Sequence, residues 1–202
     1  MNIYYSYLSD FSENDFEAFY KYIPKEKAEK LVKVKNYKSK NESLLAWFLL
    51  YKAITEKGIE EYSVCFGDDG KPYLKDIPLF FNLSHSNDLV CCAVGEREVG
   101  IDAEKIKPVK DALINKVLTE NERATLKEKD CDFIRFWTLK ESFLKHSGCG
   151  ITSEIYKLDF SANAEEEEFA FNALYFSVKG IDGYYISVCS EEKERKFIQV
   201  KP

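Results

Sequence analysis

Asp102 and Glu104 are two carboxylates whose spacing could bind a cation. They lie two residues apart in a predicted strand over residues 99–104, so their carboxylates share one face. Their Cα atoms are then roughly 6.6 Å apart. Two carboxylates at about 6 Å repel each other by about 3 kcal/mol at an effective dielectric constant of about 20. A hard ion such as Mg²⁺ between them reverses that sign; an exposed strand end is the alternative interpretation.

A predicted helix over residues 131–147 carries a second group of such side chains. Glu141 and Lys145 lie one turn apart, which also describes an ordinary helical ion pair worth about 0.3–0.5 kcal/mol. Lys140 falls within the apolar arc of the helix, where an ammonium group must reach water or meet a buried anion. The arc consists of Phe133, Phe136, Trp137, Phe143 and Leu144.

A third group lies in the polar stretch over residues 82–88, which includes Ser84, His85 and Ser86. We expect this stretch to be a loop between strands at 79–81 and 89–94. Its hydroxyl and imidazole groups could hold a phosphate, and a polar hairpin turn is the alternative. Because no Gly-x-Ser-x-Gly and no Walker loop occurs, the motifs support neither an acyl hydrolase nor a P-loop nucleotidase.

The elements that position these groups predict an α+β fold of two lobes, residues 1–100 and 101–202, because strands and helices mix without strict alternation. Capping boxes of Ser39 with Glu42 and of Thr119 with Glu122 are expected to begin two of the helices. The first of these helices should end near Gly58. The second of them is predicted at 120–128. The other helices are predicted at 14–22, 25–34, 111–118 and 131–147, and the other strands at 3–7, 64–66, 73–74, 155–160, 169–178, 184–189 and 196–200.

Length and composition exclude several classes of protein. The chain has 202 residues, of which 45% are hydrophobic, which excludes a disordered chain and provides a core without disulfide or metal. No run of about 18 apolar residues and no signal-peptide pattern occurs, so we expect a cytoplasmic protein with six reduced cysteines and no membrane contact. The net charge of −6 argues against nucleic acid as a partner. We expect a monomer.

The charge is not evenly distributed, because residues 21–40 contain eight lysines against two glutamates. A solvated helix face and a phosphate-binding site are both compatible with this composition.

In this order and spacing, the segments resemble the Sfp-type 4′-phosphopantetheinyl transferases. The resemblance covers residues 64–150. The motifs that carry it are Gly70-Lys71-Pro72, Phe81-Asn82-Leu83-Ser84-His85-Ser86, Val99-Gly100-Ile101-Asp102-Ala103-Glu104, and residues 136–145 followed by Gly148 and Gly150.

The resemblance implies two similar α/β lobes related by a pseudo-twofold axis, with coenzyme A in the cleft between them. It implies transfer of the 4′-phosphopantetheine arm from coenzyme A to a serine of an acyl or peptidyl carrier protein, with release of 3′,5′-ADP. The carrier could serve fatty-acid, polyketide or nonribosomal peptide synthesis. Two alternatives stay open: a Mg²⁺-dependent phosphohydrolase, and an inactive homologue that binds coenzyme A or a carrier.

The resemblance also assigns roles to individual residues. Asp102, Glu104 and Glu141 would hold Mg²⁺, or Mn²⁺ in its place, against the pyrophosphate. Glu141 would also draw the proton from the attacking serine, and Lys145 would stabilise or protonate the leaving phosphate. Trp137 would pack the site and orient the catalytic helix.

Further residues are assigned to coenzyme A. Ser84 and His85 would contact phosphates of its nucleotide end, and Lys71 would lie near the adenine or its 3′-phosphate. Lys140 would find its anion in a metal-binding carboxylate or a phosphate, which is an inference of our own.

One departure concerns the 3′-phosphate. The family usually has an arginine before the Leu-Leu of the long N-terminal helix, and Glu42 stands there in this chain. Lys35, Lys38 and Lys40 could take over the contact. The segment over residues 109–118 would face the carrier protein by analogy, with Lys110 and Lys116 complementing its acidic surface.

Overall fold

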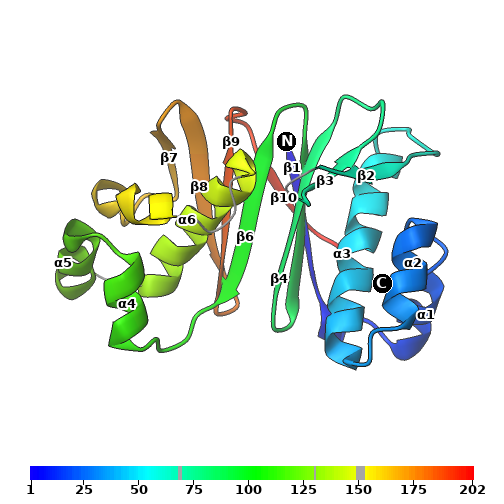
Figure 1. Ribbon diagram of the computed structural model, residues 1–202, viewed down its shortest axis with the longest axis horizontal. Coiled ribbons are helices and arrows are strands. Elements are labelled where there is room, and N and C mark those ends of the chain that lie inside the picture. The colour runs from blue at the N-terminus through cyan, green and yellow to red at the C-terminus, as the bar shows by residue number, and fades with distance from the viewer. Residues whose placement is uncertain (68–69, 130, 149–152) are drawn as a thin grey trace.

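Two four-stranded sheets, one in each half of the chain, form the centre of the protein (Figure 1). The computed structural model describes residues 1–67, 70–129, 131–148 and 153–202. The first sheet has the strand order β10-β1-β5-β4 and the second the order β6-β9-β8-β7, while β2 and β3 form a separate hairpin. The strands are β1 (Asn2–Tyr7), β2 (Val64–Phe66), β3 (Pro72–Leu74), β4 (Phe80–Ser86), β5 (Leu89–Gly95), β6 (Val99–Lys105), β7 (Glu168–Phe171), β8 (Leu174–Ile181), β9 (Tyr184–Ser190) and β10 (Lys196–Gln199).

The helices lie on the outer sides of the two sheets (Figure 1). In the first half, α1 and α2 pack on α3, which covers the first sheet; in the second half, α6 covers β6 and β9. The helices are α1 (Glu13–Phe19), α2 (Lys25–Val32), α3 (Tyr37–Thr55), α4 (Asp111–Val117), α5 (Glu120–Glu128) and α6 (Phe133–Ser147), and the short 3₁₀ helices are η1 (Leu8–Asp10), η2 (Ser153–Lys157) and η3 (Ser161–Asn163).

The two halves repeat one topology. In the first half, β1 is followed by α3 and the antiparallel hairpin β4–β5, and β5 returns to pair antiparallel with β1. In the second half, β6 is followed by α6 and the hairpin β8–β9, and β9 pairs antiparallel with β6. The expected fold of two similar α+β lobes is therefore confirmed. The division at residue 100 stays a prediction, and β10 adds a strand from the C-terminal region to the first sheet.

The alternation of side chains along the strands explains how the layers hold together. Tyr4 and Cys92 pack with α3, whereas Ile3 and Cys91, one residue away, pack in the core between the two sheets. A fully buried apolar side chain contributes roughly 1.5–3 kcal/mol, so strands that are apolar on both faces can join a helix to a second sheet. The order of layers is thus helix, sheet, sheet, helix.

Several local predictions were wrong, and each has a physical reason. The polar stretch expected as a loop over residues 82–88 is mostly strand β4, in which polar and less polar side chains alternate. The helix α3 begins two residues before Ser39, because Asn36 accepts a hydrogen bond from the backbone N–H of Ser39. No strand forms near residues 155–160, where η2 lies. The strand expected over 169–178 is divided by Asn172 and Ala173, which both have a positive φ.

Other predictions agree with the structure. Thr119 and Glu122 form the expected capping box, and α6 ends at Gly148 in the left-handed conformation. The five cysteines among the described residues are free. Cys149 and Gly150 lie outside those residues, as does the tip of the β2–β3 hairpin. Across the same part of the chain, no helix has the length and apolar character needed to cross a membrane.

Candidate active site

The site is built where α6 crosses β6, and Gly100 allows that close approach. A Cβ atom on Gly100 would lie 1.9 Å from the backbone oxygen of Ser142 and 2.4 Å from the backbone nitrogen of His146. Any side chain at position 100 would therefore push the helix away from the strand. The glycine brings the last turns of α6 over the two carboxylates of β6.

Asp102 and Lys145 form the centre of the site. Lys145 Nζ lies 2.7 Å from Asp102 Oδ1 and donates a second hydrogen bond, of 3.0 Å, to Ser84 Oγ. Ser84 in turn donates to Asp102 Oδ1 at 3.0 Å. Burial raises the pKa of Asp102, although the ammonium group of Lys145 opposes that shift. The sequence-predicted residues from β4, β6 and α6 therefore meet at one point.

Glu141 lies beside this pair, one turn before Lys145 on α6. Burial and the nearby charge of Asp102 raise the pKa of Glu141 to about 7, with a smaller contribution from Glu104 and an opposing one from Lys145. Three carboxylates thus repel one another around a single ammonium group. A bound cation would relieve this repulsion.

Two oxygen atoms of the site show how a divalent cation fits these residues. Asp102 Oδ2 and Glu141 Oε1 are both buried and have no hydrogen-bond partner, which leaves two acceptors free for a hard cation. The described residues nevertheless contain no ready-made group of three metal-ligating side chains. The positive charge that lies at Asp102 in the structure is the ammonium group of Lys145.

Glu104 is held from the opposite strand. Its Oε2 accepts a hydrogen bond of 2.7 Å from Ser86 Oγ on β4, and its side chain is partly exposed. Asp102 and Glu104 are therefore each hydrogen-bonded to a serine of β4, two residues apart.

Lys140 lies outside this site, so the anion that we inferred for it was wrong. Its Nζ lies 2.8 Å from Glu122 Oε2, and both side chains are completely buried. The same ammonium group donates to the backbone oxygens of Val117, Ile155 and Leu158. Lys140 is thus a structural residue that joins α6 to α5 and η2.

The residues expected at the nucleotide end of coenzyme A do not all face Ser84. Strand alternation turns His85 to the other side of β4, where its Nδ1 lies 3.6 Å from Glu42 Oε2 on α3. Lys38 Nζ lies 3.9 Å from Glu42 Oε1, and Lys40 pairs loosely with Glu17. Glu42 is therefore a buried anion between a histidine and a lysine, and not the partner of Ser39.

Lys71 lies at the C-terminal end of α6. Its Nζ is 2.8 Å from Glu98 Oε2 and donates a hydrogen bond of 3.2 Å to the backbone oxygen of His146. The residue that precedes β3 in the first half thus contacts the C-terminal turn of α6, next to Lys145.

Comparisons with known proteins decide the family. Residues 98–189 match the family model of the 4′-phosphopantetheinyl transferase superfamily. The 4′-phosphopantetheinyl transferase Sfp of Bacillus subtilis (strain 168) is 28% identical over 206 residues, which cover 94% of this chain and 92% of the relative. The chain is a homologue of the Sfp-type 4′-phosphopantetheinyl transferases. Its enzymatic activity, by this homology, is that of an Sfp-type transferase.

Two further relatives match this transferase over shorter regions. The 4′-phosphopantetheinyl transferase gsp of Aneurinibacillus migulanus is 33% identical over 137 residues, which cover 64% of this chain and 57% of the relative. The 4′-phosphopantetheinyl transferase psf-1 of Bacillus pumilus is 40% identical over 90 residues, which cover 42% of this chain and 39% of the relative.

A pocket of about 330 Å³ opens beside Glu104 in the transferase. Trp137 lines it and stacks on Phe133, with the ring centroids 6.0 Å apart. Its other lining residues are Lys107, Pro108, Val109, Lys110, Leu113 and Ile134. The pocket is thus lined both by Glu104, a proposed metal-binding carboxylate, and by part of the segment 109–118 that we expect to face the carrier.

A second pocket, of about 400 Å³, contains lysines that the sequence reasoning did not single out. Lys27 Nζ lies 5.6 Å from the ring centroid of Trp47, and Lys30 Nζ lies 5.8 Å from that of Phe66. Burial lowers the pKa of Lys27, and the neighbouring Lys30 adds to the effect. The lysine-rich stretch over residues 21–40 was visible in the sequence. The aromatic rings that contact Lys27 and Lys30, however, come from α3 and β2.

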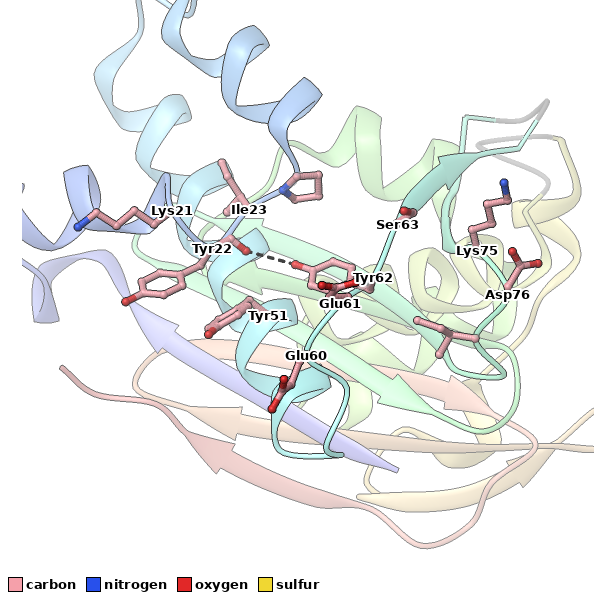
Figure 2. Close-up of a pocket in the computed structure, with 12 residues that line it drawn as sticks. Lys21, Tyr22, Ile23, Tyr51, Glu60, Glu61, Tyr62, Ser63, Lys75 and Asp76 are labelled. Atoms are coloured by element: carbon pink, nitrogen blue, oxygen red, sulfur yellow. Dashed lines mark hydrogen bonds between the residues drawn. The ribbon is translucent and has the colours of Figure 1, made fainter.

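A larger pocket, of about 650 Å³, lies elsewhere on the first half of the transferase (Figure 2). Tyr22, Tyr51 and Tyr62 line it, and Tyr62 donates a hydrogen bond of 3.2 Å to the backbone oxygen of Tyr22. None of its lining residues is one to which we assigned a catalytic, metal-binding or coenzyme A-binding role. Size alone therefore does not locate the active site in this fold.

Proposed function

We propose that this transferase moves the 4′-phosphopantetheine arm of coenzyme A to a serine hydroxyl of a carrier protein. The serine Oγ forms a bond to the phosphorus that carries the pantetheine arm, and the pyrophosphate P–O bond breaks. The serine proton goes to a base, and 3′,5′-ADP leaves. The observation that carries this proposal is the ion pair of Lys145 with Asp102 beside Glu104 and Glu141, where two buried carboxylate oxygens have no hydrogen-bond partner.

Asp102, Glu104 and Glu141 would hold Mg²⁺, or Mn²⁺ in its place. When bound, such an ion neutralises charge on the pyrophosphate oxygens. The donor set supports this assignment, because oxygen ligands from carboxylates and phosphates are those that Mg²⁺ prefers.

Two residues of α6 would act on protons and charge during transfer. Without a bound cation, burial and Asp102 raise the pKa of Glu141 to about 7, and a bound Mg²⁺ would oppose that shift. We propose that Glu141 takes the proton of the serine hydroxyl as an ionised carboxylate within hydrogen-bond reach. Lys145 is partly exposed and already contacts Asp102 and Ser84. We propose that its ammonium group turns to the leaving phosphate and stabilises the charge that develops there.

The donor would lie across the two halves, with its nucleotide end toward the first half. Lys27 and Lys30, each over an aromatic ring, offer two cations and flat apolar surfaces to a phosphorylated purine. Lys71 precedes Pro72, which pairs with Phe66 in the β2–β3 hairpin, and it contacts the end of α6. These lysines support a phosphate contact better than Lys38, whose nearest anion is Glu42.

The carrier would dock on the pocket beside Glu104. Its apolar lining by Val109, Leu113 and Trp137 can take an apolar side chain, while Lys107 and Lys110 complement an acidic surface. Docking there would deliver the carrier's serine to Glu141.

Labelling of carriers tests the proposal. A panel of apo acyl and peptidyl carriers is incubated with the protein, a fluorescent coenzyme A analogue and Mg²⁺, and we expect Mg²⁺-dependent labelling that a serine-to-alanine carrier does not show. Failure to label any of several diverse carriers, with the donor shown to bind, would overturn the proposal. Release of a nucleotide without a carrier would indicate a phosphohydrolase instead, and binding without turnover an inactive homologue.

A further inference from the structure

Strands β4 and β6 are the facing edges of the two sheets, and they meet through side chains of β4. The two strands lie side by side in the middle of the protein (Figure 1) but belong to different sheets. The backbone N–H groups of Ile101, Ala103 and Lys105 point to β4. They donate hydrogen bonds to Asn82 Oδ1, Ser84 Oγ and Ser86 Oγ at 3.0, 3.2 and 3.3 Å, respectively.

The spacing of these hydrogen bonds follows from strand geometry. Every second residue of β4 sends its side chain to the same face, and every second residue of β6 presents its N–H to the same edge. Three polar side chains two residues apart therefore satisfy three edge N–H groups, which would be costly to bury unpaired. This ladder of three hydrogen bonds sets the register of β6, which carries the proposed metal ligands, against β4.

The ladder also determines where one hydroxyl proton points. Ser86 Oγ accepts hydrogen bonds from Lys105 N and from Asn87 Nδ2. A hydroxyl has two acceptor positions and one proton, so the remaining proton of Ser86 is directed to Glu104 Oε2, 2.7 Å away. The hydrogen bond thus restrains a flexible carboxylate that lies partly exposed at the rim of the site.

We propose that Ser86 is a positioning residue that holds Glu104 ready to bind the metal ion. The inference rests on the proposed function, since it takes Glu104 as a metal ligand. Ser86 itself touches neither donor nor carrier in this account. Partners of metal ligands usually change metal affinity by about 10- to 100-fold when they are removed. We expect a change at the lower end, because Asp102 and Glu141 do not depend on Ser86.

Ser86 allows a cleaner test than Ser84. Ser84 contacts Asp102 and Lys145 together, so its removal would disturb both metal binding and the leaving-group lysine. Ser177 provides a matched control, because it is a buried strand serine of the second sheet whose hydroxyl has no hydrogen-bond partner among the described residues.

Binding of Mn²⁺ to the full chain without donor or carrier, followed by electron paramagnetic resonance, measures the effect directly. We expect Ser86→Ala to raise the dissociation constant about tenfold, Ser86→Thr to restore it to within about twofold, and Ser177→Ala to leave it unchanged. In the transfer assay, Ser86→Ala should raise the Mg²⁺ concentration for half-activation while kcat at saturating Mg²⁺ stays near wild type. A purely structural role would lower the melting temperature without moving these metal constants.

An unchanged Mn²⁺ dissociation constant and an unchanged Mg²⁺ midpoint in folded Ser86→Ala would overturn the inference. If Ser86→Ala does not fold, Ser86→Cys, which keeps the size but donates weakly, is measured against the same expectations. If the wild type transfers normally and the Ser86 variants change neither metal constant, only the role of Ser86 is contradicted. A wild-type protein that neither binds Mn²⁺ nor labels a carrier would contradict the proposed function itself.

Discussion

Lys145 Nζ lies 2.7 Å from Asp102 Oδ1, so a lysine of α6 neutralises the most deeply buried carboxylate of the candidate metal site. The ammonium group and a metal ion would compete for the same carboxylate. If Lys145 then moves to the leaving phosphate, one side chain stabilises the site before the donor binds and acts on the substrate afterwards.

Replacement of Lys145 should separate metal binding from catalysis. In Lys145→Met, we expect Mn²⁺ to bind at least as tightly as in the wild type, because the competing cation at Asp102 is gone. Transfer to a carrier should fall at least about a hundredfold, since charge on the leaving phosphate is no longer stabilised. Mn²⁺ titration and steady-state kinetics measure the two effects; clearly weaker Mn²⁺ binding would mean that Lys145 helps to build the site.

Glu141→Gln should stabilise the metal-free protein in a pH-dependent way. The pKa of Glu141 is raised to about 7 from its usual value of 4.5, so the folded state holds this proton more tightly than the unfolded state. Ionisation of Glu141 therefore costs the metal-free protein stability as the pH rises from about 4.5 to 7. We expect a higher melting temperature for Glu141→Gln at pH 8 and little difference at pH 4. An equal shift at both values would show that the gain does not come from the charge.

Lys140 and Glu122 should behave as a structural pair. Lys140→Met leaves the Glu122 carboxylate buried without its cation, and we expect a loss of about 3–5 kcal/mol in the free energy of unfolding. The double variant with Glu122→Gln should recover part of that loss. Urea unfolding measures both variants. Mn²⁺ affinity of the folded single variant should equal that of the wild type, and a large change in it would place Lys140 back in the active site.

Glu42 should weaken selection for the 3′-phosphate of the donor. Its carboxylate is largely buried and lies 3.6 Å from His85 Nδ1, so a dianionic phosphate that reached His85 from this side would meet a negative charge. We expect kcat/KM for 3′-dephospho-coenzyme A to be within about tenfold of that for coenzyme A, and Glu42→Gln to increase the preference for coenzyme A. A strong preference for coenzyme A in the wild type that Glu42→Gln leaves unchanged would contradict this effect of Glu42.

The parts of the site that lie on one element were predictable from the sequence. A period of two placed Asp102 and Glu104 on one face, and a period of 3.6 placed Glu141 and Lys145 one turn apart. The end of α6 at Gly148 and the capping box of Thr119 and Glu122 also followed from local rules, because both depend on residues within a few positions of each other.

The parts that depend on partners from distant segments were not predictable. Lys140 was identified as a misplaced cation, but its anion lies on α5, and nothing local indicates that contact. The stretch with Ser84 and His85 looked like a loop because most of its residues are polar. In the structure, Asn82, Ser84 and Ser86 are buried, and two of the backbone N–H groups of β6 donate to Asn82 and Ser84. The alternation of polar and less polar residues over 82–86 was nevertheless visible in the sequence, and it indicates a strand with one polar face.

The most direct test of the active-site assignment is the mass of an apo carrier protein after incubation with coenzyme A, Mg²⁺ and wild-type, Asp102→Ala or Glu141→Ala protein. The wild type should add one phosphopantetheine group to the carrier's serine, with one 3′,5′-ADP released per group, while both variants stay folded and fail to transfer. A folded Asp102→Ala or Glu141→Ala variant that retains more than about a tenth of the wild-type turnover, against the loss of at least a hundredfold expected for a catalytic group, would contradict the assignment.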